Sequence, residues 1–264
     1  MHNIYKSMYF VRHSERFDKV NPDAWKASKR YKDNPQDTPI SENGHKIAEK
    51  TMQDILRKDQ REIGEIFSSP AERCIQTALE FQKQIKEKYS ILIPIKIENG
   101  LIYDQYNIEN YIKKFEKNKV IFGTEIKKLI FVDEYMKPNN IAKRFGEESF
   151  DLSYKPIISI KEINAKNTPE KQFNMRLQTV MEICARVDKN KLNISVTHFE
   201  VICDIICSFF FRLKYNNELD RFREKYFDYN DYCFWVMVII ERDILKVTDI
   251  KNKEGIYKIT KKIY

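Results

Sequence analysis

Strand-like and helix-like segments alternate through the first 100 residues, and this alternation most constrains the fold. Short apolar runs lie at residues 8–11, 63–67 and 91–97, and stretches with apolar residues at helical spacing occupy 42–57 and 71–88. Strands that alternate with helices predict a parallel sheet with crossover helices. We therefore expect an α/β fold, a three-layer sandwich with helices on both faces of a mostly parallel sheet.

A second group of elements is expected after residue 168. The sequence predicts a helix at 168–187, a strand at 193–197, an apolar helix at 199–213, a buried strand at 233–240, and late strands at 244–247 and 256–259. The late strands are expected to form an antiparallel edge of the sheet.

Residues 100–165 do not follow the alternation. Ile108–Phe115 has helical spacing, Leu129–Val132 fits a strand or a helical turn, and Lys137–Lys166 is irregular. We interpret this region as an insertion at the carboxyl edge of the sheet. The whole chain, residues 1–264, is then expected to form a single domain.

Composition limits the function classes. The formal net charge of +8 favours acidic partners such as phosphorylated substrates. The lysines are spread along the chain and no nucleic-acid-binding motif is found, so specific nucleic-acid binding is not expected. Five cysteines at irregular spacing favour a reduced protein over a disulfide framework or a zinc site. No secretory signal and no apolar run of the ~20 residues that span a bilayer are found, which favours a cytoplasmic location.

Charged residues suited to phosphate chemistry follow two of the expected strands. Arg12, His13 and Arg16 come after the first strand, and His198 follows the strand at 193–197. The carboxyl ends of parallel strands meet at one edge of a sheet, where open α/β proteins place their chemistry. These side chains are therefore expected to converge.

Arg73 lies in the first turn of the helix at 71–88, whose N-terminus would face the same edge. A helix N-terminus adds favourable partial charge toward an anion, and guanidinium groups bind phosphate bidentately. A histidine can form a covalent intermediate with phosphorus. Two histidines and three arginines therefore predict a phosphate pocket.

Four short motifs occur in a fixed order: Arg12-His13-Ser14, Asp-Thr-Pro-Ile-Ser-Glu-Asn-Gly at 37–44, Ser-Ser-Pro-Ala-Glu-Arg-Cys-Ile-Gln-Thr-Ala at 68–78, and Val196-Thr197-His198. With them the chain resembles, along nearly its whole length, the histidine phosphatase superfamily, which has the phosphoglycerate mutase-like fold. The corresponding motifs there are Arg-His-Gly, Asp-x-Pro-Leu-Thr-x-x-Gly, Ser-Ser-Pro-x-x-Arg-x-x-x-Thr-Ala and Val-Thr-His. The stretch from Val11 to Arg16 is most similar to the tyrosine phosphatase branch that carries ubiquitin-associated and SH3 domains.

The resemblance implies hydrolysis of a phosphate monoester without a metal ion or another cofactor. His13 would be the nucleophile that becomes phosphorylated, and the phosphoryl group would be held by Arg12, Arg16, Arg73 and His198. Water would then hydrolyse the phosphohistidine. The implied partner is a phosphorylated small molecule or phosphoprotein, and a homodimer or larger assembly is left open.

Two positions depart from the motifs of the superfamily. Ser14 stands in place of a glycine, and a small residue is tolerated there if its φ is negative. The superfamily takes its proton donor from a Gly-Leu-x-Glu segment, which resembles residues 100–103 with Tyr103 at the acid position. Asp104 is therefore the candidate proton donor, with Glu109 a remoter one. Loss of the acid would cost about 10²–10⁴-fold in rate.

Two functions of different classes fit these residues. The first is a metal-independent phosphomonoesterase of the histidine acid phosphatase type. The second is a catalytically weak or inactive phosphatase-like protein that serves as a structural or binding subunit of a larger assembly. The altered acid segment permits the second, whereas the cluster of arginines favours the first, since buried charges without an anion are costly.

Other polar residues have simpler interpretations. Ser41 is expected to cap the helix at 42–57, and Glu200 to cap the helix that follows His198. His45 is expected to be exposed and idle, and Trp25 is a candidate substrate contact at the rim of the pocket.

Overall fold

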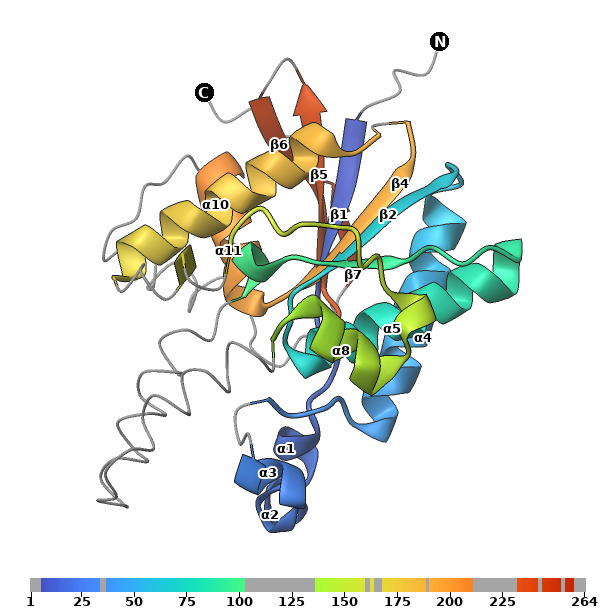
Figure 1. Cartoon of the computed structure of the whole chain (residues 1–264). Helices are drawn as coiled ribbons and strands as arrows, with labels where there is room; N and C mark the ends of the chain where they lie inside the picture. The colour runs from blue at the N-terminus through green and yellow to red at the C-terminus, as the bar shows by residue number, and fades with distance from the viewer. Residues whose placement is uncertain are drawn as a thin grey trace.

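The computed structural model describes residues 6–33, 37–102, 136–159, 162–163, 168–188, 190–210, 232–241, 244–252 and 255–258. Within these ranges a seven-stranded sheet has the order β3-β2-β4-β1-β5-β6-β7 (Figure 1). The strands are β1 (Lys6–Arg12), β2 (Ile63–Ser68), β3 (Ile95–Ile97), β4 (Leu192–Thr197), β5 (Trp235–Glu241), β6 (Ile244–Asn252) and β7 (Gly255–Lys258).

Strand β1 lies at the centre of the sheet and joins two halves of different character. On one side it pairs in parallel with β4, and the parallel pairing continues through β2 to β3. On the other side it pairs antiparallel with β5, followed by β6 and β7, each antiparallel to its neighbour. The expected antiparallel edge is therefore confirmed.

Helices cover both faces of the sheet. The helical segments are α1 (Phe17–Val20), α2 (Pro22–Ala27), α3 (Lys29–Asp33), α4 (Glu42–Lys58), α5 (Glu72–Tyr89), η1 (Asn99–Leu101), α8 (Pro138–Phe145), η2 (Glu147–Ser149), α10 (Pro169–Arg186), α11 (Phe199–Ile205) and the π-helical η3 (Ile206–Phe210). Among the described residues, no helix is both long enough and apolar enough to cross a membrane.

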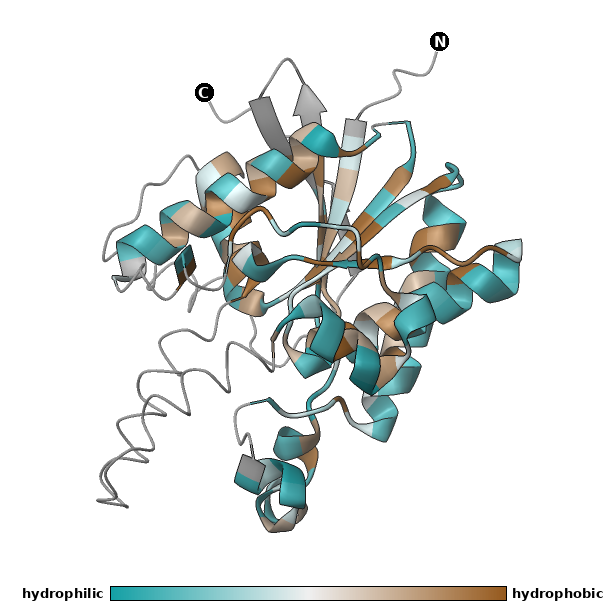
Figure 2. Cartoon of the chain, viewed as in Figure 1, coloured by the Kyte–Doolittle hydropathy of each residue, from teal (hydrophilic) through white to brown (hydrophobic). Residues whose placement is uncertain are grey.

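The alternation of side chains along β1 creates two cores. Tyr9 and Val11 pack in a cluster with residues of α4, α5 and α8, whereas Met8 and Phe10 pack with α10 and α11. Successive strand residues point to opposite faces, so one central strand supplies both cores. Figure 2 shows hydrophobic residues along the strands and hydrophilic ones over much of the outer helices. The expected three-layer α/β arrangement is confirmed.

The two helices on the second face are joined by a buried ion pair. Arg176 of α10 donates through Nε to the carboxylate of Asp204 in α11 at 2.7 Å, and the two side chains are 5% and 0% exposed. The pair fixes α11, which starts directly after His198, against α10.

Three expected boundaries are wrong. Strand β3 begins at Ile95 because its pairing with β2 begins there, and Ile91, expected in the strand, is 40% exposed. Residues 138–145 form helix α8 instead of irregular chain, with Pro138 in the first turn, where proline is tolerated. The helix expected at 199–213 changes to π-helix at Ile206.

Several expectations for the region at 100–165 lie outside the described residues. They are the helix at 108–115 and the strand or turn at 129–132. The described part beyond them contains α8 and η2, and Phe150 bridges to Ile95 of β3.

Candidate active site

His13 and His198 lie together at the carboxyl ends of the neighbouring strands β1 and β4. The strand pairing sets Arg12 opposite Thr197, and the backbone N–H of His13 donates to the carbonyl oxygen of Thr197 at 2.8 Å. The centres of the two imidazole rings are consequently 5.6 Å apart. The structure thus brings the two histidines together at one edge of the sheet.

The surroundings of His13 favour a neutral imidazole with a lone pair on Nε2. Its Nδ1 donates to the carbonyl oxygen of Ser14 at 2.8 Å, and the residue is 4% exposed. Burial, followed by the charges of Arg73 and Arg12, holds the pKa of His13 well below its ordinary value. A neutral imidazole with Nε2 available is the form that attacks an electrophile.

His198 is held by contacts at both ring nitrogens. Nη2 of Arg73 donates to Nδ1 of His198 at 3.1 Å. Because a guanidinium is only a donor, Nδ1 is the acceptor and the proton of the imidazole is on Nε2. That N–H donates to Oγ of Ser69 at 2.9 Å. Arg73 and Ser69 therefore fix both the ring and the tautomer of His198.

Ser14 fits the position where a glycine was expected. The non-glycine residues with positive φ in the described part of the chain are Ser90 and Cys233, so the condition for a serine is met. Its backbone N–H donates to Oγ1 of Thr77 at 2.9 Å, and its hydroxyl donates to the carbonyl oxygen of Gly44 at 2.6 Å. The loop after His13 is thus tied to both α4 and α5.

Asp37 fixes the start of α5 and lies in the electrostatic field of Arg73. Its Oδ1 accepts from the backbone N–H of Glu72 at 2.7 Å, and the residue is 5% exposed. Burial raises the pKa of Asp37 to about 6, against the opposing charge of Arg73. The segment at 37–44 therefore helps to position Arg73.

Arg12 is buried against two aromatic rings that the sequence did not identify as site residues. Its guanidinium carbon lies 4.7 Å from the ring centre of Tyr232 and 5.1 Å from that of Phe199. Burial lowers the pKa of Arg12, and the nearby Glu200 opposes this shift. The sequence signal for Tyr232 was indirect, because Tyr232 is brought to Arg12 by β5, which returns beside β1. The backbone N–H of Arg12 donates to the carbonyl oxygen of Phe234 at 3.0 Å.

Two of the expected site residues are not joined to this cluster by the described contacts. Arg16 forms a two-point pair with Asp18, from Nε to Oδ1 at 2.9 Å and from Nη2 to Oδ2 at 2.8 Å. Burial raises the pKa of Tyr232, while Arg12 and then Arg16 oppose the shift, so the charge of Arg16 reaches this cluster. Asp104 lies outside the described residues, as do Tyr103 and Glu109.

Glu98, which follows β3, is the described carboxylate nearest in sequence to the expected proton donor. It accepts from the hydroxyl of Tyr154 at 2.7 Å and from the backbone N–H groups of Ile157 at 2.7 Å and Gly100 at 2.9 Å. Burial raises its pKa, and these hydrogen bonds oppose the rise. Glu98 therefore anchors the chain at 154–157 to the sheet edge.

The simpler interpretations have mixed outcomes. The Oγ of Ser41 accepts from the backbone N–H of Gly44 at 2.9 Å, which confirms the cap of α4. His45, expected to be idle, pairs through Nδ1 with Oε1 of Glu80 at 2.6 Å. Trp25 is 4% exposed and packs edge-on against Tyr31, and its contact with a substrate stays a prediction.

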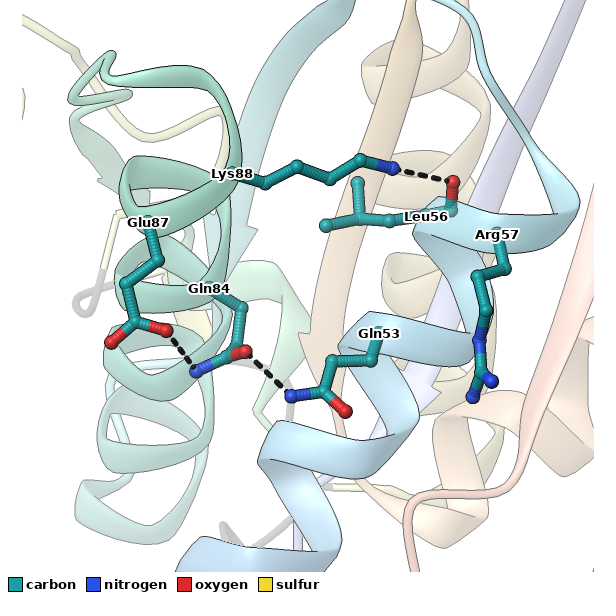
Figure 3. Close-up of a pocket in the computed structure, with 6 residues that line it drawn as sticks. All are labelled: Gln53, Leu56, Arg57, Gln84, Glu87 and Lys88. Carbon is teal, nitrogen blue, oxygen red and sulfur yellow. Dashed lines mark hydrogen bonds between the residues drawn. The ribbon is translucent and has the colours of Figure 1, made fainter.

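A cavity of about 420 Å³ lies between α4 and α5 and holds none of these residues. It is lined by Gln53, Leu56, Arg57, Gln84, Glu87 and Lys88 (Figure 3). Along α5 it lies about 16 Å from Arg73, at 1.5 Å per residue. Its amides and carboxylate bond to one another, as from Gln53 to Gln84 at 2.9 Å.

No group of three or more His, Cys, Asp or Glu suited to a metal ion is found among the described residues.

Comparison with solved structures gives a likeness that covers most of the chain. A structure of the ecdysone phosphate phosphatase EPPase from Bombix mori, in complex with tungstate, is 16% identical, with a TM-score of 0.60, over 90% of this chain and 93% of that chain. Phosphoserine phosphatase from Entamoeba histolytica is 16% identical, with a TM-score of 0.46, over 93% and 96%. Mycobacterial glucosyl-3-phosphoglycerate phosphatase is 12% identical, with a TM-score of 0.47, over 94% and 97%. At such identities the first likeness shows a shared fold.

The sequence comparison is confined to the N-terminal part of the chain. Residues 8–102 match the model of the histidine phosphatase superfamily (branch 1), and no curated protein matches. The matched segment contains three of the four motifs, including His13 and Arg73. It does not test the finer similarity to the tyrosine phosphatase branch. The resemblance to the histidine phosphatase superfamily is therefore confirmed over residues 8–102, and the α/β fold is phosphoglycerate mutase-like.

Proposed function

We propose that the protein is a metal-independent phosphomonoesterase that acts through a phosphohistidine at His13. The observation that carries the proposal is the convergence of His13, His198 and Arg73 at one sheet edge, with Arg12 beside them. The family match and the phosphatase names of similar structures support a phosphorylated substrate, either a small molecule or a phosphoprotein.

The first chemical step is attack of Nε2 of His13 on phosphorus. A bond forms between nitrogen and phosphorus while the bond from phosphorus to the leaving oxygen breaks, and the electron pair departs with that oxygen. Arg12 and Arg73 stabilise the charge on the other phosphoryl oxygens. In the second step a bond forms between the oxygen of water and phosphorus while the bond from phosphorus to Nε2 breaks. The electron pair returns to Nε2, a proton of the water passes to the group that had protonated the leaving oxygen, and inorganic phosphate leaves with His13 neutral again.

The free protein holds Arg73 in a form that suits this reaction. Its Nη2 donates to the neutral Nδ1 of His198, at 3.1 Å. A phosphate oxygen is a stronger, charged acceptor than a neutral imidazole. An arriving phosphate can therefore take this hydrogen bond, while His198 stays held at Nε2 by Ser69. Arg16 can also bind the phosphate if its guanidinium leaves the carboxylate of Asp18 and donates to the substrate.

Asp104 is the proposed proton donor to the leaving oxygen, on the strength of its place in the segment after β3. Phenols leave without full protonation more readily than alcohols, so aryl phosphates are the substrates least dependent on Asp104. We further propose one domain over residues 1–264, with the insertion at about 100–165 deciding which ester is accepted. The five cysteines are buried thiols that form no disulfide, which supports a reducing compartment such as the cytoplasm.

Hydrolysis of p-nitrophenyl phosphate by purified protein in chelator tests the proposal. The wild type is expected to turn over, and His13→Ala is expected to lose at least about 10³-fold in kcat, because the proposed phosphoryl acceptor is removed. His45→Ala, which removes a histidine paired with Glu80, is the matched control. Quenching of the wild type in alkaline denaturant during turnover is expected to trap a phosphoryl adduct that is stable in base and labile in acid.

Equal inactivity of the wild type and His13→Ala from pH 5 to 8 would contradict the proposal that the protein is a phosphomonoesterase. The second function, a phosphatase-like binding subunit, would then explain Tyr103 at the position of the acid. Inorganic phosphate that still binds to such an inactive protein would favour that function directly.

A further inference from the structure

The two arginines that flank His13 are held by different kinds of partner. Arg16 makes two hydrogen bonds to the carboxylate of Asp18, at 2.9 and 2.8 Å. Arg12 lies over two rings, with its guanidinium carbon 4.7 Å from the centre of Tyr232 and 5.1 Å from that of Phe199, and the charge of Glu200 also favours its protonated form. We call Arg12, Phe199 and Tyr232 the aromatic clamp.

The face of an aromatic ring and a carboxylate hold a guanidinium differently, and the difference affects how a phosphate can bind its N–H donors. A carboxylate occupies the N–H donors in strong, directional bonds that phosphate must displace. The face of an aromatic ring attracts the positive charge through its quadrupole and forms no such bond. The two rings therefore help to keep the guanidinium of Arg12 buried and oriented without themselves occupying an N–H donor.

Tyr232 is tied to Arg12 through the backbone as well as through its ring. The turn that contains Tyr232 leads through Cys233 to Phe234, whose carbonyl oxygen accepts the N–H of Arg12 at 3.0 Å. Cys233 has a φ of 52°, which turns the chain toward β5. The half-buried ring of Tyr232 also faces His13, with 6.4 Å between ring centres. The ring therefore lies beside both the nucleophile and the arginine next to it.

We propose that Tyr232 is a positioning residue that, with Phe199, holds the guanidinium of Arg12 ready for the phosphoryl group. The inference rests on the proposed function, in which Arg12 binds phosphate. It assigns the role to the ring of Tyr232 and not to its hydroxyl. Loss of the ring leaves a buried cation that is less well oriented, so phosphate binding weakens.

The test compares Tyr232→Phe, Tyr232→Leu and Tyr232→Met by calorimetric titration with inorganic phosphate and by hydrolysis of p-nitrophenyl phosphate. Tyr232→Phe is expected to stay within about twofold of wild type in both the Kd for phosphate and kcat/KM, since it keeps the ring. Tyr232→Leu and Tyr232→Met are expected to weaken phosphate binding about tenfold and to raise KM, with unchanged thermal unfolding. The methionine fills most of the lost volume and separates loss of the ring from loss of packing.

The matched control is Tyr89→Leu, since Tyr89 also lies under a cation, Lys88 at 5.0 Å, but at the far end of α5. Phosphate affinity retained by both ringless variants would overturn the inference while leaving the proposed function intact. A loss of kcat in Tyr232→Phe at unchanged phosphate affinity would also overturn it, because the hydroxyl would then act in the chemistry. A wild type that binds no phosphate would overturn both, and a wild type that binds phosphate without hydrolysis would overturn the proposed function alone.

Discussion

Nη2 of Arg73 donates to Nδ1 of His198 at 3.1 Å, and this contact decides where the imidazole proton lies. With Nδ1 occupied as an acceptor, Nε2 carries the hydrogen and donates to Ser69 at 2.9 Å. Arg73 of α5, His198 directly after β4 and Ser69 in the loop before α5 thus form one chain of hydrogen bonds. The pocket is held in one protonation pattern before any phosphate enters.

Removal of the hydroxyl of Ser69 should weaken catalysis without unfolding the protein. We expect Ser69→Ala to lower kcat/KM about 3- to 10-fold, the worth of one hydrogen bond that fixes the ring of His198. The control is Ser195→Ala on β4, because the buried Ser195 hydroxyl has no hydrogen-bond partner in the described structure. Equal kinetics for the two variants on an aryl phosphate would show that Ser69 does not position His198.

The buried carboxyl of Asp37 should make stability depend on pH in an unusual direction. Burial raises its pKa to about 6 in the folded protein, above its ordinary value of 3.8, so the folded state binds the proton more tightly. Ionisation between about pH 4 and 6 therefore lowers the free energy of unfolding, and this loss persists above pH 6. Asp37→Asn keeps an oxygen for the Glu72 N–H and removes this loss.

The measurement is urea unfolding of the wild type and Asp37→Asn at pH 4.5 and 7.5. We expect the variant to gain about 2 kcal/mol relative to wild type between these pH values. Asp54→Asn is the control of opposite sign, because Lys251 and Arg57 lower the pKa of Asp54 against its desolvation. A difference between wild type and Asp37→Asn that does not change with pH would contradict the prediction.

Removal of one partner of the buried ion pair between Arg176 and Asp204 should destabilise the protein strongly, whereas replacement of both by apolar residues should not. Asp204→Ala leaves Arg176 buried without its carboxylate, and we expect a loss of about 3–5 kcal/mol in the free energy of unfolding. The double variant Arg176→Met/Asp204→Leu should recover most of this loss, because it leaves no buried charge. The exposed pair of Glu182 and Arg186 provides the comparison: Glu182→Ala is expected to cost less than about 1 kcal/mol. A single variant as stable as the double one would refute this account.

Much of the fold follows from local sequence. The strands that end at Arg12 and Thr197 and the helix that starts before Arg73 were recognised from apolar periodicity and from a proline in the first turn. These elements meet because parallel strands bring their carboxyl ends to one edge. The two histidines therefore converge through a rule that applies to any parallel sheet.

The residues that were missed depend on contacts that no local pattern encodes. Tyr232 reaches Arg12 because β5 returns antiparallel beside β1, and the apolar run at 233–240 indicates a strand without indicating its neighbour. The start of β3 was misplaced for the same reason. Ile91 is as β-branched as Ile95, but the pairing with β2 begins only at Ile95. Arg16 was expected in the pocket from its spacing, whereas a carboxylate two residues away, Asp18, holds it in the free protein.

Because of the hydrogen bond from the backbone N–H of His13 to the carbonyl oxygen of Thr197, some substitutions would move the two histidines apart and others would not. This hydrogen bond makes the distance between the two histidines a property of two neighbouring strands whose residues are buried on both faces of the sheet. Segments outside the strands can be exchanged without altering that distance. Under the proposed function, the phosphate ester that is accepted would then change with the loops alone, while the spacing of the two histidines stays the same.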